Sequence, residues 1–385
     1  MVETWTPELS QSIKNLALQV GFDCSGIVAF VEDADETETV DANRFSTWIE
    51  AGRAGEMEYL KRRDAAGVLL RSDVRVAIPW ARSVIICAIN YNATRQRSID
   101  PAPEDTGWIA RYAWSGRQQA DGTIGPSDYH EELLSRLKRM EEFIHEHAPC
   151  ETRCYVDTGP IVERSLAARA GVGWIGKNTC VINQELGSWL LLGVIVTSLP
   201  VEPSAIGLQA ADRCGSCTRC IDACPTEALV APRQMDASRC IAYLTIEKKG
   251  TIAPELRGLM GRQVFGCDIC QDVCPWNRRA PIAVKEGMQP RAELINPQLT
   301  ALAEIDNSEF RRMFRGSPLE RTRRKRLHRN VAIAMGNSGD QQFLPRLNEW
   351  SGSEDEVLAE TASWAVRQIS RLSTGRESCS VEPKD

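Results

Sequence analysis

Residues 214–225 read CGSCTRCIDACP, and residues 267–275 read CDICQDVCP. The first run has the spacing C-x2-C-x2-C-x3-C-P, in which three closely spaced thiolates bind one cubane cluster and the fourth reaches a second cluster. The second run keeps the C-x2-C-x3-C-P part and takes its missing ligand from Cys240 upstream. The spacing therefore predicts two 4Fe–4S clusters and an electron-transfer protein.

Crossed ligation, the arrangement typical of such paired clusters, divides the eight cysteines into two sets. The predicted sets are Cys214, Cys217, Cys220 and Cys274 for one cluster, and Cys224, Cys240, Cys267 and Cys270 for the other. Structural zinc is the alternative, because C-x2-C pairs also bind zinc. The two Cys-Pro endings and the full count of eight ligands favour iron–sulfur clusters over zinc, and a disulfide framework is less favoured still.

Composition and charge narrow the class of protein. The chain has 385 residues, of which 43% are hydrophobic, enough for a sizeable core and two or three domains. Charged residues interrupt the N-terminal segment, so we expect neither a signal peptide nor a membrane span there, and the unexported thiols indicate a reducing cytoplasm. The formal net charge of −6 excludes a globally basic nucleic-acid binder and leaves only a local patch.

Apolar runs at 83–89 and 189–196 predict buried strands, and helical spacing over 128–147 predicts an amphipathic helix. A further strand is expected at 153–156. Together these patterns indicate an α/β domain over residues 1–203, followed by a two-cluster ferredoxin-like module over 204–285 and an all-α, HEAT-like region over 286–385.

The C-terminal region carries a weak internal repeat and a basic run. Residues 330–335 and 361–366 are similar, with a glycine-containing turn at 336–340, as in one HEAT-type helical hairpin. Six basic residues precede the repeat: Arg321, Arg323, Arg324, Lys325, Arg326 and Arg329. A solvated helix face and a set of nucleic-acid phosphate contacts both fit this run.

A possible ligand site follows the strand at 153–156. The segment Val156-Asp157-Thr158-Gly159-Pro160 ends this strand and opens a helix, with Pro160 suited to the first helical position. In open α/β folds ligands collect at the carboxyl ends of strands, and the glycines at 171–176 permit close backbone approach to a large ligand. By position alone, Asp157 fits a helix cap at least as well as a catalytic acid.

Several longer motifs resemble those of the epoxyqueuosine reductases. They are RYAWSG (111–116), SDYH (127–130), DTGP (157–160), ERSLAARAGVGWIGKNT (163–179), GSWLLLG (187–193), CIAYLTIEKKG (240–250), FGCDICQDVCPWN (265–277) and RNVAIAMGN (329–337). The resemblance covers nearly the whole chain. It implies a cobalamin-binding N-terminal domain related to that of reductive dehalogenases, two 4Fe–4S clusters and a helical region that contacts tRNA.

The resemblance also implies roles for individual residues. The family's DTG aspartate is the proton donor, which corresponds to Asp157, and Asp128 is the next carboxylate to consider. Cobalamin contacts are expected from Asp157, Arg71, Lys177 and Asn178. The insertion GRQQADGTIGP before SDYH departs from the family pattern, and Ala110 stands where some relatives carry a cysteine near the corrin.

The expected reaction is the last step of queuosine biosynthesis, reduction of epoxyqueuosine at the wobble position of tRNA with a GUN anticodon. We expect an external electron donor, a monomer, and a pKa of Asp157 raised by burial against the corrin. Reductive dehalogenation, ferredoxin-type electron carriage, and tRNA binding with purely structural clusters are the alternatives. The other cysteines, Cys180 among them, are expected to be small buried hydrophobes or incidental thiols.

Overall fold

The strand β2 (Ser83–Asn90) forms the centre of the N-terminal region, and all eight of its residues are buried. In this computed structural model, which describes residues 4–30, 36–202, 208–283 and 285–377, β2 belongs to a four-stranded sheet of order β1-β2-β9-β6. The other strands are β1 (Cys24–Ala29), β6 (Thr152–Tyr155) and β9 (Leu190–Thr197). The runs predicted at 83–89 and 189–196 are thus confirmed as neighbouring buried strands.

Helices cover both faces of this sheet, which explains why β2 is apolar on both sides. On one face, α1 (Pro7–Gln19) and α4 (Tyr129–His147) pack on Ile85, Cys87 and Ile89. On the other face, α3 (Val74–Ala77) and α5 (Glu163–Arg169) pack on Val84, Ile86 and Ala88. Alternate residues of one strand therefore enter two separate hydrophobic clusters.

Every pairing in this sheet is antiparallel. The expectation drawn from open α/β folds therefore does not apply, because the rule about carboxyl ends concerns parallel strands. The region combines helices and a sheet, as an α/β domain would, but its strands are antiparallel.

The helix predicted at 128–147 is confirmed as α4, whose N-cap is Asp128. The predicted start of the next helix is wrong. Pro160 lies in a bend, and α5 begins only at Glu163. Residues 157–162 therefore form a loop between β6 and α5, which gives Asp157 a setting different from a helix cap.

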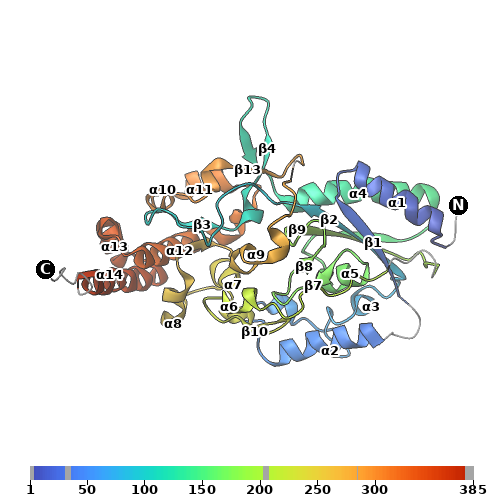
Figure 1. Ribbon diagram of the computed structural model, residues 1–385, viewed down its shortest axis with the longest axis horizontal. Helices are drawn as coiled ribbons and strands as arrows, with labels where there is room; N and C mark the ends of the chain where they lie inside the picture. Colours follow the sequence, from blue (N-terminus) through green and yellow to red (C-terminus); the bar gives the residue numbers. More distant parts are fainter. Residues whose placement is uncertain (1–3, 31–35, 203–207, 284, 378–385) are drawn as a thin grey trace.

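The remaining elements surround the sheet or lie beyond it (Figure 1). The other helices are α2 (Glu36–Glu50), α6 (Arg219–Asp222), α7 (Ile241–Ile246), α8 (Pro254–Arg257), α9 (Ile269–Asp272), α10 (Leu299–Glu304), α11 (Asn307–Phe314), α12 (Arg323–Ser338), α13 (Leu344–Ser351) and α14 (Glu356–Glu377). The short strands are β3 (Trp108–Ile109), β4 (Ser115–Gln118), β5 (Ile124–Pro126), β7 (Trp174–Ile175), β8 (Val181–Ile182), β10 (Leu229–Ala231), β11 (Gln234–Met235), β12 (Gln263–Phe265) and β13 (Gln289–Pro290).

From Leu299 onward the C-terminal region is helical, as predicted, and α12 packs against α14, whereas the short strand β13 lies inside the region that was expected to be all-α. One hydrophobic cluster extends from Leu244 on α7 through Phe265 on β12 to Val331 on α12 and Ile369 on α14. The cysteine-rich module and the helical tail therefore share a single core, and β12 additionally pairs with β3 of the N-terminal region.

The insertion at 117–125 forms a hairpin. Strands β4 and β5 pair with each other, and β4 also pairs with β13. The hairpin projects at the top of Figure 1, away from the module. No helix in the described part of the chain has both the length and the apolar character needed to cross a membrane.

Candidate functional site

A cavity of about 1730 Å³ opens where the sheet, the cysteine-rich module and the helical tail meet. Small-molecule pockets usually measure roughly 300–1,000 Å³, so this cavity has room for a macrocyclic cofactor together with part of a second ligand. Leu190, Leu191 and Leu192 at the start of β9 contribute an apolar wall, whereas Arg321 and its neighbours line the tail side. A cofactor and a second ligand bound together in the cavity would therefore contact an apolar wall and a cationic wall.

Asp157 lies on the cavity wall, two residues after the end of β6. Its φ of 57° is left-handed, a conformation that costs a non-glycine residue of order 1–3 kcal/mol and tends to occur at functional sites. The backbone N–H of Asp157 donates a hydrogen bond of 2.8 Å to Oε1 of Glu163 at the start of α5. This contact holds the strained loop in place.

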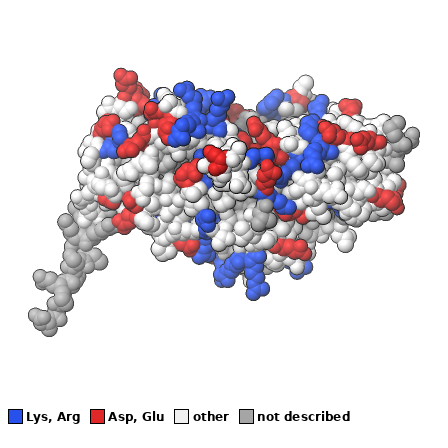
Figure 2. All heavy atoms as spheres, turned by 90° about the horizontal axis from the view of Figure 1, so that it is seen from above, with Lys and Arg blue, Asp and Glu red and all other residues white. Residues whose placement is uncertain are grey.

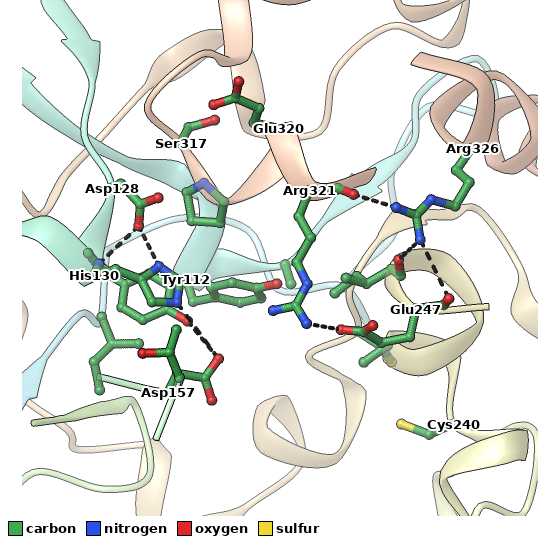
Figure 3. Close-up of a pocket in the computed structure, with 18 of the residues that line it drawn as sticks. Tyr112, Asp128, His130, Asp157, Cys240, Glu247, Ser317, Glu320, Arg321 and Arg326 are labelled. Carbon is green, nitrogen blue, oxygen red and sulfur yellow. Dashed lines mark hydrogen bonds and ion pairs between the residues drawn. The ribbon is translucent and has the colours of Figure 1, made fainter. Parts of the chain in front are cut away.

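The first turn of α4 brings an acid–base group to Asp157 (Figure 3). Asp128 caps the helix by accepting from the backbone N–H of His130, and its Oδ1 lies 2.6 Å from Nδ1 of His130. The other imidazole nitrogen, Nε2, lies 3.8 Å from Oδ2 of Asp157. The Tyr129 hydroxyl donates to the same Asp157 oxygen at 3.2 Å. His130 therefore lies between two carboxylates.

These contacts determine which group holds a proton. Burial lowers the pKa of His130, but hydrogen bonds to Asp128 and Asp157 outweigh burial and raise the pKa to about 9. Burial raises the pKa of Asp157, yet the hydrogen bond and charge of His130 outweigh it and leave the pKa below its usual value. The expected rise in the Asp157 pKa depends on burial against the corrin and stays a prediction; the structure adds His130, a partner of Asp157 that acts in the opposite direction.

The carboxyl group of Glu163, near Asp157, has a raised pKa, in contrast to that of Asp157. Burial, assisted by the charge of Asp157, raises the pKa of Glu163 to about 7. Glu163 also lines the cavity. At neutral pH, His130 and part of the Glu163 population therefore carry protons close to an ionised Asp157.

Contacts among the predicted cluster ligands are compatible with the crossed assignment, which stays a prediction. Cys214 and Cys274 pack in one hydrophobic cluster, and Cys240 and Cys267 pack against another. Electrostatic interactions between the thiols follow the same division: Cys274 with Cys214 and Cys220, Cys220 with Cys217, and Cys267 with Cys224 and Cys240. Two sets of thiols held this way suit two cubane clusters.

Three thiols of the second set line the cavity, namely Cys240, Cys267 and Cys270. Cys180 lines it as well and forms a side-chain hydrogen bond with Cys270. Sequence reasoning missed this ninth cysteine because Cys180 lies far upstream of both runs and has no cluster spacing. The only available signal was its place directly after the glycine-rich loop.

The basic run at 321–329 is neither a uniform solvated face nor a uniform phosphate surface. Arg329 is buried and donates to the carbonyl groups of Leu244, Lys248 and Gly250. Arg326 donates to the carbonyl of Ile246. These two arginines bind the C-terminal end of α7, the helix that follows Cys240.

All six cations of this run, Arg326 and Arg329 included, contribute to the cavity lining. Arg321, Arg323, Arg324 and Lys325 all line it, together with Lys249 and Arg311. Arg321 forms an ion pair of 2.7 Å with Glu247, across the cavity from Asp157 and His130 (Figure 3). Seen from above, the Lys and Arg side chains of the surface form separate groups among acidic ones (Figure 2). An anionic partner would therefore be bound by a local group of cations and not by the protein surface as a whole.

The expected cofactor contacts divide into two kinds. Asn178 lines the cavity beside Asp157, and its Nδ2 donates to the carbonyl of Cys270 at 3.4 Å. Arg71 instead donates to the carbonyl of Ile161, and Lys177 to the carbonyl of Gly215; the cavity lining contains neither. Ala110 does line the cavity, so this position offers a methyl group in place of a thiol.

Two protein families match parts of the chain. Residues 71–158 match the family described as "Epoxyqueuosine reductase QueG, DUF1730". Residues 213–277 match the family described as "4Fe-4S double cluster binding domain". The second match spans all eight predicted cluster ligands, from Cys214 to Cys274.

Curated relatives are similar along almost the whole length. The epoxyqueuosine reductase of Pseudomonas aeruginosa is 38% identical, with 94% of each chain covered. That of Escherichia coli is 36% identical, covering 97% of this chain and 92% of the relative. A crystal structure of epoxyqueuosine reductase with an epoxyqueuosine-modified tRNA-Tyr stem loop matches with a TM-score of 0.81 and 29% identity, covering 98% of this chain and 95% of the other.

Proposed function

The chain belongs to the epoxyqueuosine reductase family, and we propose that it reduces epoxyqueuosine to queuosine at the wobble position of tRNA, the last step of queuosine biosynthesis. One observation carries this proposal. A single cavity is lined by predicted cluster thiols, by a carboxylate with a protonated histidine beside it, and by a group of cations. The groups that would deliver electrons, donate protons and bind a polyanionic substrate therefore all line the same cavity.

The proposed cofactors are two 4Fe–4S clusters and cobalamin. The clusters would be held by the two sets of four cysteines, and a corrin ring would lie in the cavity between the leucines of β9 and the Asp157 loop, within reach of Asn178. When bound, cobalamin supplies a low-valent metal centre able to activate the epoxide carbon–oxygen bond. Arg71 and Lys177 would act on this site indirectly, Arg71 through the Asp157 loop and Lys177 through the loop of Cys214.

Removal of the epoxide oxygen as water consumes two electrons and two protons. Asp157 is the proposed proton donor to the departing oxygen. Because its pKa is lowered in the ligand-free protein, Asp157 must receive a proton before it can give one. His130, whose pKa is raised to about 9, carries that proton at neutral pH and has Nε2 3.8 Å from the acceptor oxygen. Small movements on substrate binding would close this distance.

Asp128 holds the histidine in position. Its carboxylate binds Nδ1 of His130, so that Nε2 is directed at Asp157 and the imidazolium form is stabilised. The Tyr129 hydroxyl donates to the same Asp157 oxygen. In this arrangement Asp157 transfers the proton, His130 replenishes it, and Asp128 and Tyr129 are positioning residues.

The cations on the tail side are the proposed tRNA contacts. Arg323, Arg324 and Lys325 lie together at the start of α12 and face the cavity. Arginine and lysine side chains bind phosphate groups without regard to sequence and make affinity salt-dependent. The three remaining basic residues of the run already have partners within the protein: Arg321 pairs with Glu247, and Arg326 and Arg329 donate to carbonyl groups of α7.

Nucleoside mass spectrometry tests the proposal directly. Epoxyqueuosine-containing tRNA with a GUN anticodon is incubated anaerobically with the reconstituted, chemically reduced protein, with and without cobalamin. Loss of one oxygen only in the presence of cobalamin is expected. Unchanged nucleoside despite intact, reducible clusters would reject the proposal and favour a dehalogenase or an electron carrier. We also propose a cytoplasmic monomer, because a tRNA substrate and oxygen-sensitive clusters suit that compartment and one chain supplies every group named.

A further inference from the structure

The two sets of predicted cluster thiols differ in their access to the cavity and to solvent. Cys240, Cys267 and Cys270 line the cavity, whereas the cavity lining includes none of Cys214, Cys217, Cys220 and Cys274. The loop that carries Cys214 and Cys217 is largely exposed at Gly215, Ser216 and Thr218. The first set is therefore on the side where an electron would enter, and the second on the side where it would be used.

Four basic side chains surround this exposed loop. Arg213 directly precedes Cys214, and Arg219 directly precedes Cys220, and both are exposed. Lys177 donates from Nζ to the carbonyl of Gly215 at 2.7 Å. Arg233 pairs with Asp212, and its backbone N–H donates to the carbonyl of Lys177. Lys177, Arg213, Arg219 and Arg233, here called the entry patch, are thus tied to the loop or adjacent to its cysteines.

The acidic groups near the entry patch leave it with an excess of positive charge. Asp212 is engaged by Arg233, and Asp222 accepts from the Thr218 hydroxyl. Among the residues that the structure describes, no carboxylate lies within ion-pairing distance of Arg213 or Arg219. This excess contrasts with the formal net charge of −6 of the whole chain. A charged patch of sign opposite to the rest of the molecule orients an approaching partner.

We propose that the entry patch is the docking surface for a small, acidic, low-potential one-electron carrier protein. The inference rests on the proposed function, because it requires the clusters. In each encounter the reduced carrier loses one electron and the cluster of Cys214, Cys217, Cys220 and Cys274 gains it. Two encounters supply the two electrons that removal of one epoxide oxygen consumes. The acidic carrier binds through ion pairs at the rim, and the exposed loop brings its redox centre close to the cluster.

The test uses the full-length protein with reconstituted clusters and an acidic plant-type 2Fe–2S ferredoxin, whose potential of about −400 mV is low enough to reduce such clusters. Stopped-flow absorbance measures cluster reduction, and calorimetry measures the Kd of the oxidised ferredoxin. The variant Arg213→Glu/Arg219→Glu is compared with Arg139→Glu, which reverses an exposed charge on α4. In Figure 1, α4 lies at the upper right, beside α1, and α6 lies in the lower middle.

We expect the double variant to lose at least ~10-fold in association rate and affinity at low salt, because rim charges act mainly on encounter rates. The dependence on salt should weaken in parallel, while Arg139→Glu behaves as the parent protein. Reduced methyl viologen, a small cation, should reduce both variants at least as fast as the parent, which shows that the clusters are intact. Equal ferredoxin rates in all three proteins would overturn the proposal. Failure to assemble eight irons would instead reject the proposed function.

Discussion

The backbone N–H of Asp157 donates to the Oε1 atom of Glu163 at a distance of 2.8 Å. This bond spans the loop that sequence patterns had assigned to a helix, and it fixes Asp157 in a left-handed conformation. The acceptor is the same carboxyl group whose pKa is raised to about 7. The orientation of the proposed proton donor therefore depends on a neighbouring residue that itself titrates near neutrality.

Glu163 is predicted to position Asp157. Glu163→Gln keeps an oxygen that can accept the bond and should retain most of the turnover, whereas Glu163→Ala should lose about 10–100-fold, because small misplacements of a catalytic group are costly. The two variants are compared by their single-turnover rates on epoxyqueuosine tRNA, and their iron content is measured to verify that the clusters have assembled. Equal rates for the two variants would contradict a positioning role.

Asp157→Asn should retain both clusters, bound cobalamin and tRNA affinity but lose about 10²–10⁴-fold in turnover, the usual contribution of a positioned acid. His130→Gln should lose less, since solvent can still protonate Asp157 slowly, and its rate should fall with rising pH earlier than that of the parent. The turnover rate measured as a function of pH distinguishes the His130→Gln variant from the Asp157→Asn variant. An active Asp157→Asn variant would remove Asp157 from the acid role.

His130 should make stability pH-dependent. Its folded pKa of about 9 exceeds the ordinary value of 6.5, so its contribution is fully present below about pH 6.5 and is lost as pH rises through about 9. A shift of this size corresponds to up to about 3 kcal/mol. Denaturant unfolding from pH 6 to 10 should show this loss in the parent and a flatter profile in Asp128→Asn, where histidine NMR should also report a lower pKa. A His130 resonance that titrates near 6.5 in the parent would refute this prediction.

Arg329→Ala should destabilise the fold by about 2–4 kcal/mol. It leaves the buried carbonyl group of Leu244 without this donor and also removes a donor from the carbonyl groups of Lys248 and Gly250. Because α7 follows Cys240, iron content should fall as well. Arg323→Ala, at the exposed start of the same helix, is the matched control and should change stability by less than about 0.5 kcal/mol. Similar losses in both variants would mean that Arg329 has no special structural role.

Cys240→Ala should remove one cluster and leave about half of the iron, because each set needs four thiolates. Cys180→Ala should keep the full iron content, since its thiol is a neighbour of Cys270 and stands outside the two sets. Iron and sulfide analysis of the reconstituted proteins measures both. Loss of a cluster in Cys180→Ala would place Cys180 among the ligands.

Sequence alone could predict the parts that depend on local spacing. The cluster cysteines follow a fixed spacing, α4 has a helical period, and β2 and β9 are continuous apolar runs. Asp157 could be chosen from family resemblance. These features are encoded within a few residues, so a pattern is sufficient to find them.

The features that were missed depend on contacts between distant segments. His130 reads as a polar position at the start of a helix, and only the fold brings it to Asp157, 27 residues later. Arg329 reads as one more cation in a basic run, although its partners lie about 80 residues upstream. The antiparallel order of the sheet pairs strands separated by whole helices, and no local pattern specifies that order.

The core shared by the module and the tail bears on how the protein is made. The last predicted cluster ligand, Cys274, leaves the ribosome well before Ile369, whose side chain belongs to the core around α7 and β12. A ribosome-bound chain therefore presents all eight thiols on a surface that is still incompletely packed. Iron–sulfur assembly has to wait for release of the chain, or else must act on a nascent protein that its own C-terminus has not yet closed.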